Sequence, residues 1–176
     1  MKKVVFYKIL YLLFLFLVGA LIGGILEICY QLLTKGSFKL GGFLYGPIRP
    51  IYGWGTILLH LIGSKFNKNI IVTFIASFII CSIFEYLSSY ILYVIFNRTW
   101  WDYSGFPFNI NGRICLPISI CFGILGVVFI KVIEPILRLI YIKSNKKILF
   151  LIIIITFTLY KIDGTISLIH NIDKVK

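Results

Sequence analysis

Charged side chains are scarce in this chain, and acidic side chains are the scarcest of all. Only six of the 176 residues are Asp or Glu, and 14% are charged, whereas about a quarter of a soluble globular domain is charged. Hydrophobic residues make up 60% of the chain, and its mean hydropathy is +0.99. This composition excludes an ordinary soluble domain and predicts an integral membrane protein.

The sequence also lacks the signatures of soluble enzymes. It contains no G-x-x-x-x-G-K-[ST] phosphate loop, so the chain has no ATP site of that kind. It contains no G-x-S-x-G and no H-E-x-x-H, and its two histidines are far apart. We therefore assign no catalytic residue, no cofactor and no metal site from the sequence, and we expect no intrinsic enzymatic activity.

Cysteine usage excludes two further classes of protein. The four cysteines fall in or beside apolar stretches and form no C-x-x-C pair, so their spacing predicts neither a disulfide framework nor a zinc site. They are interpreted as small buried apolar side chains.

What the chain does contain is a series of long apolar runs. About 20 apolar residues are needed to cross the hydrocarbon core as a helix. We therefore predict an all-α, polytopic helical bundle that forms a single multi-pass membrane domain over residues 1–176. Its five predicted segments are 9–33, 51–62, 70–96, 114–141 and 148–169.

The second segment differs from the others because it is short and rich in Gly and Pro. Non-helical backbone at membrane depth is tolerated only where protein or a water-filled cavity shields it from lipid. The segment is therefore either a tilted, irregular span or a re-entrant segment, and we favour the span.

The net charge is +12, and the basic residues gather between the apolar runs. We therefore expect them to set the membrane topology and to meet anionic headgroups, and not to bind nucleic acid. We expect a protein of the cell membrane with a cytoplasmic N-terminus and the 97–113 loop on the opposite side. The basic residues placed on the cytoplasmic side are Lys2, Lys3, Lys8, Lys65, Lys68, Lys131, Arg138, Lys143, Lys146 and Lys147.

Several polar side chains interrupt the apolar segments. Gly19, Gly23, Glu27 and Gln31 recur every four residues and therefore share one helix face. A carboxylate at the centre of a bilayer costs about 2.5 kcal/mol or more, so Glu27 is a candidate functional residue. The remaining candidates for a polar intramembrane core are Glu85 and Asp163.

Two loops carry further candidate site residues, and Arg49 and Arg113 in these loops are the expected partners of the buried glutamates. We expect Glu27 and Glu85 to converge in one polar core, and the 97–113 loop to cover it. The candidate loop residues are Gly46, Pro47, Arg49, Pro50, Tyr52, Gly53, Trp100, Trp101, Asp102, Tyr103, Ser104, Asn111, Gly112 and Arg113.

These motifs resemble the CmpB-like family of membrane proteins, which are named type IV ABC transporters. The resemblance rests on Gly24 with Glu27, the run from Gly42 to Gly53, Glu85, the WWDYS sequence at 100–104 and the NGR sequence at 111–113. Arg49 departs from the family pattern, in which a small or thiol side chain is expected before Pro50. The family name implies a membrane subunit that works with a separate ATPase.

Three hypotheses for the function follow. The leading one is a permease-like transporter subunit with a polar intramembrane site and an unspecified substrate. The alternatives are an intramembrane enzyme that acts on a lipid or lipid-linked substrate, and a non-catalytic membrane scaffold. The expected partners are the lipid bilayer and a separate ATPase subunit, with a homo-oligomer left open and nucleic acid excluded.

Overall fold

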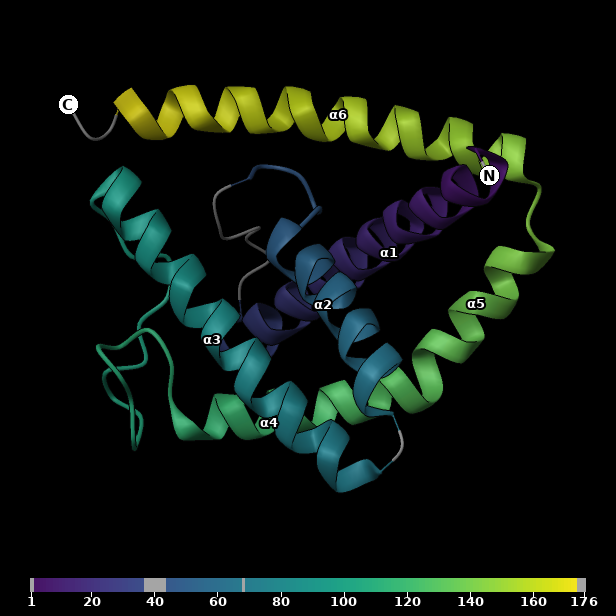
Figure 1. Ribbon diagram of the computed structural model, residues 1–176. Helices are drawn as coiled ribbons and strands as arrows, with labels where there is room; N and C mark the ends of the chain where they lie inside the picture. Colours follow the sequence, from purple (N-terminus) through teal and green to yellow (C-terminus); the bar gives the residue numbers. More distant parts are fainter. Residues whose placement is uncertain (1, 37–43, 68, 174–176) are drawn as a thin grey trace. The chain divides into compact units, whose positions relative to one another are not determined.

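The computed structural model describes residues 2–36, 44–67 and 69–173, and nearly all of them are helical (Figure 1). No β-strand occurs in these ranges, so the all-α class predicted from the sequence is confirmed. The elements are α1 (Lys2–Lys35), α2 (Pro50–Phe66), α3 (Ile70–Phe96), α4 (Leu116–Val128), the π-helical turn η1 (Phe129–Ile133), α5 (Glu134–Lys143) and α6 (Lys146–Asp173).

Within the described residues, four helices are long and apolar enough to cross a membrane. They comprise Lys3–Leu33, Ile70–Phe96, Leu116–Lys143 and Lys146–His170. The protein is therefore a membrane protein. The second predicted segment forms the 17-residue helix α2, which at 1.5 Å per residue is about 26 Å long and falls short of the ~30 Å core. Helix α2 is regular from Pro50 onward, and the irregular backbone that we expected lies in the loop before α2.

The chain divides into two compact units, and the first comprises residues 1–57 and 139–176. Its hydrophobic core is formed mainly by α1, with contributions from the loop before α2 and from the end of α5 and the start of α6. The core residues are Leu10, Phe16, Leu17, Ala20, Ile48, Tyr141 and Ile153.

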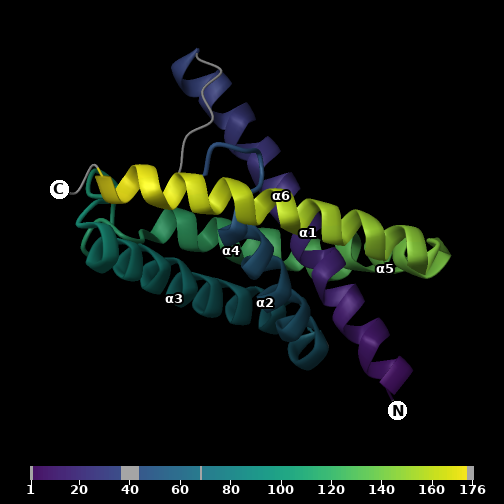
Figure 2. The ribbon, with the colours of Figure 1, turned by 90° about the horizontal axis from the view of Figure 1, so that it is seen from above.

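In this unit α1 and α6 contact one another and cross, and both helices begin at the right of the view and run towards the left (Figure 2). The ring centroids of Phe6 and Phe150 are 5.6 Å apart, and those of Phe16 and Phe157 are 5.5 Å apart. A later residue of α1 thus contacts a later residue of α6, as it does only in parallel helices.

Small residues on α1 allow α2 to approach closely. A Cβ atom on Gly19 would lie 1.8 Å from Thr56 Oγ1, and one on Gly23 would lie 2.1 Å from the ring of Tyr52. The GxxxG pair of α1 therefore provides a close helix contact, as this pattern does in other membrane proteins.

The second unit comprises residues 58–138 and is built around the packing of α3 against α4. Asn69 caps the start of α3 by accepting a hydrogen bond from the Ile71 backbone N–H. Glycines of α4 again allow the close approach, because a Cβ on Gly126 would lie 2.2 Å from Ser77 Oγ. The hydroxyl of Ser82 also donates to that of Ser119 across this contact, at 2.8 Å.

The π-helical turn between α4 and α5 has a clear cause in the sequence. Pro135 has no N–H and its ring clashes with the preceding turn of a regular helix. The chain widens before it, so that the Glu134 N–H donates to the carbonyl of Phe129, five residues earlier. The helix therefore continues through the proline instead of ending there.

We predict that Gly126→Ala weakens the packing of α3 on α4. The new methyl group would lie 2.3 Å from Ser77 Cβ, so the helices must separate, and we expect the free energy of unfolding to fall by about 1–3 kcal/mol. Denaturant unfolding of the purified protein in detergent measures this change. Gly55→Ala is the matched control, since a Cβ there meets no atom within 4 Å. Equal stability of the two variants would contradict the prediction.

Candidate functional site

The loop before α2 places a charged side chain in the interior of the first unit. Its described part, residues 44–49, is non-helical and ends at Pro50, where α2 begins. Pro47 and Pro50 have no N–H to offer a regular hydrogen-bond pattern. Arg49 is only 5% exposed, so its positive charge requires partners within the protein.

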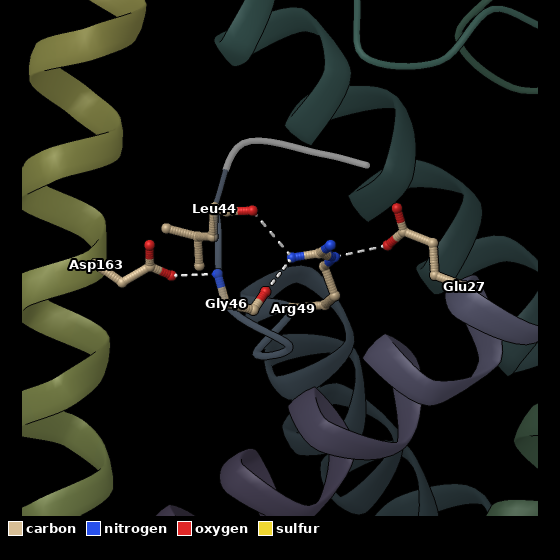
Figure 3. Close-up of polar contacts among 5 residues, drawn as sticks. All are labelled: Glu27, Leu44, Gly46, Arg49 and Asp163. Atoms are coloured by element: carbon tan, nitrogen blue, oxygen red, sulfur yellow. Dashed lines mark hydrogen bonds and ion pairs between the residues drawn. The ribbon is translucent and has the colours of Figure 1, made fainter. Parts of the chain in front are cut away.

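Glu27 of α1 is the partner of Arg49 (Figure 3). Arg49 Nε donates to Glu27 Oε2 at 2.8 Å. Its Nη1 atom donates to the carbonyls of Gly46 at 2.7 Å and Leu44 at 3.3 Å. The guanidinium therefore joins the carboxylate of a membrane-spanning helix to the backbone of its own loop.

Asp163 of α6 holds the same loop through its backbone amides (Figure 3). The N–H of Tyr45 donates to Asp163 Oδ1 at 3.1 Å, and that of Gly46 donates to Oδ2 at 2.9 Å. Ser167, one turn further along α6, donates its hydroxyl to Oδ1 at 3.3 Å. The loop is thus fixed by one carboxylate from α1 and a second one from α6.

Close approach of the loop to α1 depends on Gly24. A Cβ atom at this position would lie 1.9 Å from the carbonyl oxygen of Pro47, so no other residue fits without displacing the loop. The Arg49 N–H donates to the carbonyl of Ala20 at 3.1 Å, which adds a second backbone contact.

One family model matches most of the chain. The family model described as "Putative ABC-transporter type IV" matches residues 14–168. The chain belongs to this family. The resemblance inferred from the motifs is thereby confirmed, and the matched range contains every candidate residue. No curated protein and no solved structure matches the chain.

Two other candidates follow directly after the loop at residues 44–49, and a third lies on α1. Tyr52 and Gly53 are in the first turn of α2, where their N–H groups donate to the carbonyl of Arg49. A Cβ on Gly53 would lie 2.8 Å from Phe16, so this glycine serves helix packing. Gln31 is half-buried and lies one turn beyond Glu27 on α1.

In the second unit, the 97–113 loop folds on itself around Asp102. Asp102 accepts hydrogen bonds from the backbone N–H of Ser104 at 2.9 Å and from its hydroxyl at 3.0 Å. Gly112 has a φ of +66°, and a Cβ there would lie 2.4 Å from Asp102 Oδ1. Asp102 therefore engages the backbone amide and the hydroxyl of Ser104.

The same loop brings Tyr103 and Arg113 against α3. Tyr103 lies beside the carboxylate of Glu85. Trp101 Nε1 donates to the Arg113 carbonyl at 3.3 Å. Trp100 packs edge-on against Phe96, with ring centroids 5.3 Å apart.

The guanidinium of Arg113 lies over tyrosine rings of α3. Its Cζ atom is 5.7 Å from the ring centroid of Tyr86 and 5.3 Å from those of Tyr90 and Tyr93. Asn111 donates its side-chain amide to the hydroxyl of Tyr86 at 3.0 Å. Glu27 belongs to the first unit and Glu85 to the second, so their expected convergence remains a prediction.

Glu134, which was not among the residues expected to be functional, lies against a histidine. Glu134 Oε1 lies 2.5 Å from His60 Nδ1, and both side chains are largely buried. Glu134 stands directly after the π-helical turn, a feature that is frequent at functional sites. The signal that could have identified it is an acid placed before Pro135 in an otherwise apolar segment.

The polar side chains of both units form ion pairs and hydrogen bonds to the backbone. Among the described residues, no group of three His, Cys, Asp or Glu side chains is placed to hold a metal ion. The polar loop of the first unit is the strongest candidate site, because it combines two carboxylates, a buried guanidinium and non-helical backbone.

We predict that the Arg49–Glu27 pair stabilises the first unit. Arg49→Gln leaves the Glu27 carboxylate without its cation, and we expect the free energy of unfolding to fall by about 3–5 kcal/mol. In Glu27→Gln/Arg49→Gln, the loss should be at least about 1 kcal/mol smaller than the sum of the two single losses. Denaturant unfolding in detergent measures both quantities.

The control for this cycle is Arg138→Gln, which removes an exposed arginine and should change stability by less than about 0.5 kcal/mol. If Arg49→Gln is as stable as this control, the pair contributes nothing to folding.

Proposed function

We propose that the chain is the permease-like membrane subunit of an ATP-driven transporter, and that its substrate site is the polar loop at residues 44–49 with Glu27 and Asp163. One observation carries this proposal. The buried Arg49 guanidinium contacts Glu27 at 2.8 Å, and Asp163 binds the amides of the same loop. Charged groups within membrane-spanning helices are expensive, and they usually mark a pathway or a binding site.

The local backbone supports a substrate site in the same place. Transporters commonly build their binding sites where helices are interrupted, since free backbone groups there can contact a substrate. Here non-helical backbone lies beside carboxylates from two long apolar helices, α1 and α6. A purely structural loop would not need two acids from different helices.

Energy for transport would come from a second protein. The family name refers to ATP-binding-cassette transporters, yet the chain contains no phosphate-binding loop. The ATPase is therefore a separate subunit in this proposal.

The proposal includes five membrane crossings, with α2 as the second. Successive crossings alternate in direction, so α1 and α6 would be antiparallel if only the four long helices crossed. The contacts of Phe6 with Phe150 and of Phe16 with Phe157 support parallel helices instead. One additional crossing between them restores the alternation, and α2 is the remaining helix. The basic residues then place the N-terminus in the cytoplasm of a cell-membrane protein.

Cysteine labelling tests this topology in a variant without the native cysteines. We expect Lys3→Cys and Lys147→Cys to be protected from a membrane-impermeant maleimide applied outside intact cells, and Gly105→Cys to react. If α2 re-enters instead, positions 3 and 147 lie on opposite sides of the membrane. Labelling of Lys147→Cys with protection of Gly105→Cys would therefore exclude a crossing by α2.

Purification of the full-length chain in mild detergent tests the transporter function. We expect a P-loop ATPase to copurify from the native membrane, and the reconstituted complex to hydrolyse ATP. Asp163→Asn should lower this hydrolysis several-fold, because one of the loop amides then faces an NH₂ group instead of an oxygen.

The unfolding temperature of the Asp163→Asn protein separates a loss of function from a loss of fold, and Arg138→Gln serves as the unaffected control. Absence of an associated ATPase, together with no ATP-dependent solute flux in liposomes, would refute the transporter assignment.

A further inference from the structure

The guanidinium of Arg113 is held in a way that leaves its hydrogen-bonding capacity unused. Its contacts are the three tyrosine rings on one face of α3. Its Nε atom is buried and has no hydrogen-bond partner among the described residues. No carboxylate of the described residues forms an ion pair with Arg113, whereas Arg49 is paired with Glu27.

Unpaired donors of this kind favour an anionic ligand. A guanidinium carries five N–H donors and no acceptor, and an aromatic face attracts the charge without accepting these hydrogen bonds in a defined direction. A buried donor without an acceptor costs about 1–3 kcal/mol. Phosphate oxygens match the planar fork of arginine, which binds them in a bidentate manner.

Tyr86 adds a further donor beside Arg113. Its hydroxyl oxygen accepts a hydrogen bond from Asn111 Nδ2 at 3.0 Å, so its own proton remains available to donate. The chain here also enters α4, which begins at Leu116 and has no acidic residue in its first turn. The start of a helix favours an anion, whereas the carboxylate of Asp102, which lies beside Gly112 in the same loop, opposes one.

The surrounding loop indicates where that anion comes from. Phe106 is 47% exposed and Phe108 is 80% exposed, and the loop also contains Trp100 and Trp101. Tryptophan and tyrosine side chains gather at the headgroup level of membranes, and the loop contains Tyr103 as well as the two tryptophans. An arginine at this level lies among the phosphate groups of the lipids.

We propose that Arg113 and Tyr86 form a phosphate-binding site, and that its ligand is the headgroup of an anionic phospholipid. Arg113 supplies bidentate N–H donors, Tyr90 and Tyr93 hold the guanidinium in place, and Tyr86 donates its hydroxyl proton. This site does not depend on the proposed transport function, because lipid binding requires neither ATPase nor flux. A free phosphate ion shares the same chemistry and is distinguished by the experiment.

Lipid retention by the purified full-length protein tests the site. Native mass spectrometry compares bound phosphatidylglycerol with phosphatidylcholine of the same acyl chains. We expect Arg113→Gln to reduce phosphatidylglycerol binding about tenfold, as the loss of a charge-assisted hydrogen bond predicts. Arg98→Gln is the matched control, because Arg98 lies in the same loop and contacts the ring of Trp100. It should bind phosphatidylglycerol as the unmodified chain does.

Two further measurements keep the test decisive. Tyr86→Phe keeps the ring over which Arg113 lies and removes only the hydroxyl, so a several-fold loss of phosphatidylglycerol supports the site even where Arg113→Gln does not fold. Radiolabelled inorganic phosphate is the second probe. Arg113-dependent binding of this ion without lipid retention would support the same phosphate site with a soluble ligand. Unchanged lipid retention in Arg113→Gln and Tyr86→Phe, without phosphate binding, would overturn the proposal.

Discussion

The contact between Arg49 and Glu27 is the interaction on which the first unit of this protein depends. An isolated charge within a membrane-spanning segment is unfavourable. Here the two opposite charges offset this free-energy cost for each other, because Arg49 Nε lies 2.8 Å from Glu27 Oε2. The guanidinium also binds the carbonyls of Leu44 and Gly46. Arg49 thereby links the loop before α2 to the Glu27 face of α1.

That contact is possible only because α1 is lined with small residues. Gly19 and Gly23 bring α2 close, and Gly24 admits the carbonyl of Pro47. Asp163 then completes the arrangement from α6 by accepting the loop amides. Charge pairing therefore depends on close packing, because the loop and the helices must approach within the reach of an arginine side chain.

The second unit also holds an arginine against an apolar helix, but the contacts of this arginine are different. Arg49 and Arg113 both stand shortly before a helix that contains a proline in its first positions. Arg49 binds a carboxylate, whereas Arg113 lies over three tyrosine rings and retains a buried nitrogen without an acceptor. The two arginines look alike in the sequence, yet one of them is structurally satisfied and the other favours an external anion.

Composition and periodicity determined the membrane class and the positions of the long helices, because both follow from the local residue pattern. The family was recognised from short motifs, above all the WWDYS sequence at 100–104 and the NGR sequence at 111–113. The four-residue spacing from Gly19 to Gln31 also identified Glu27 as an interior acid. Periodicity assigns a residue to a face of its own helix, but it does not say which other helix that face meets. Only the tertiary structure could show that Asp163 binds backbone amides rather than a cation, and that Glu134 faces His60 across 74 residues. Those pairings depend on how helices distant in sequence pack, and no local pattern encodes that packing.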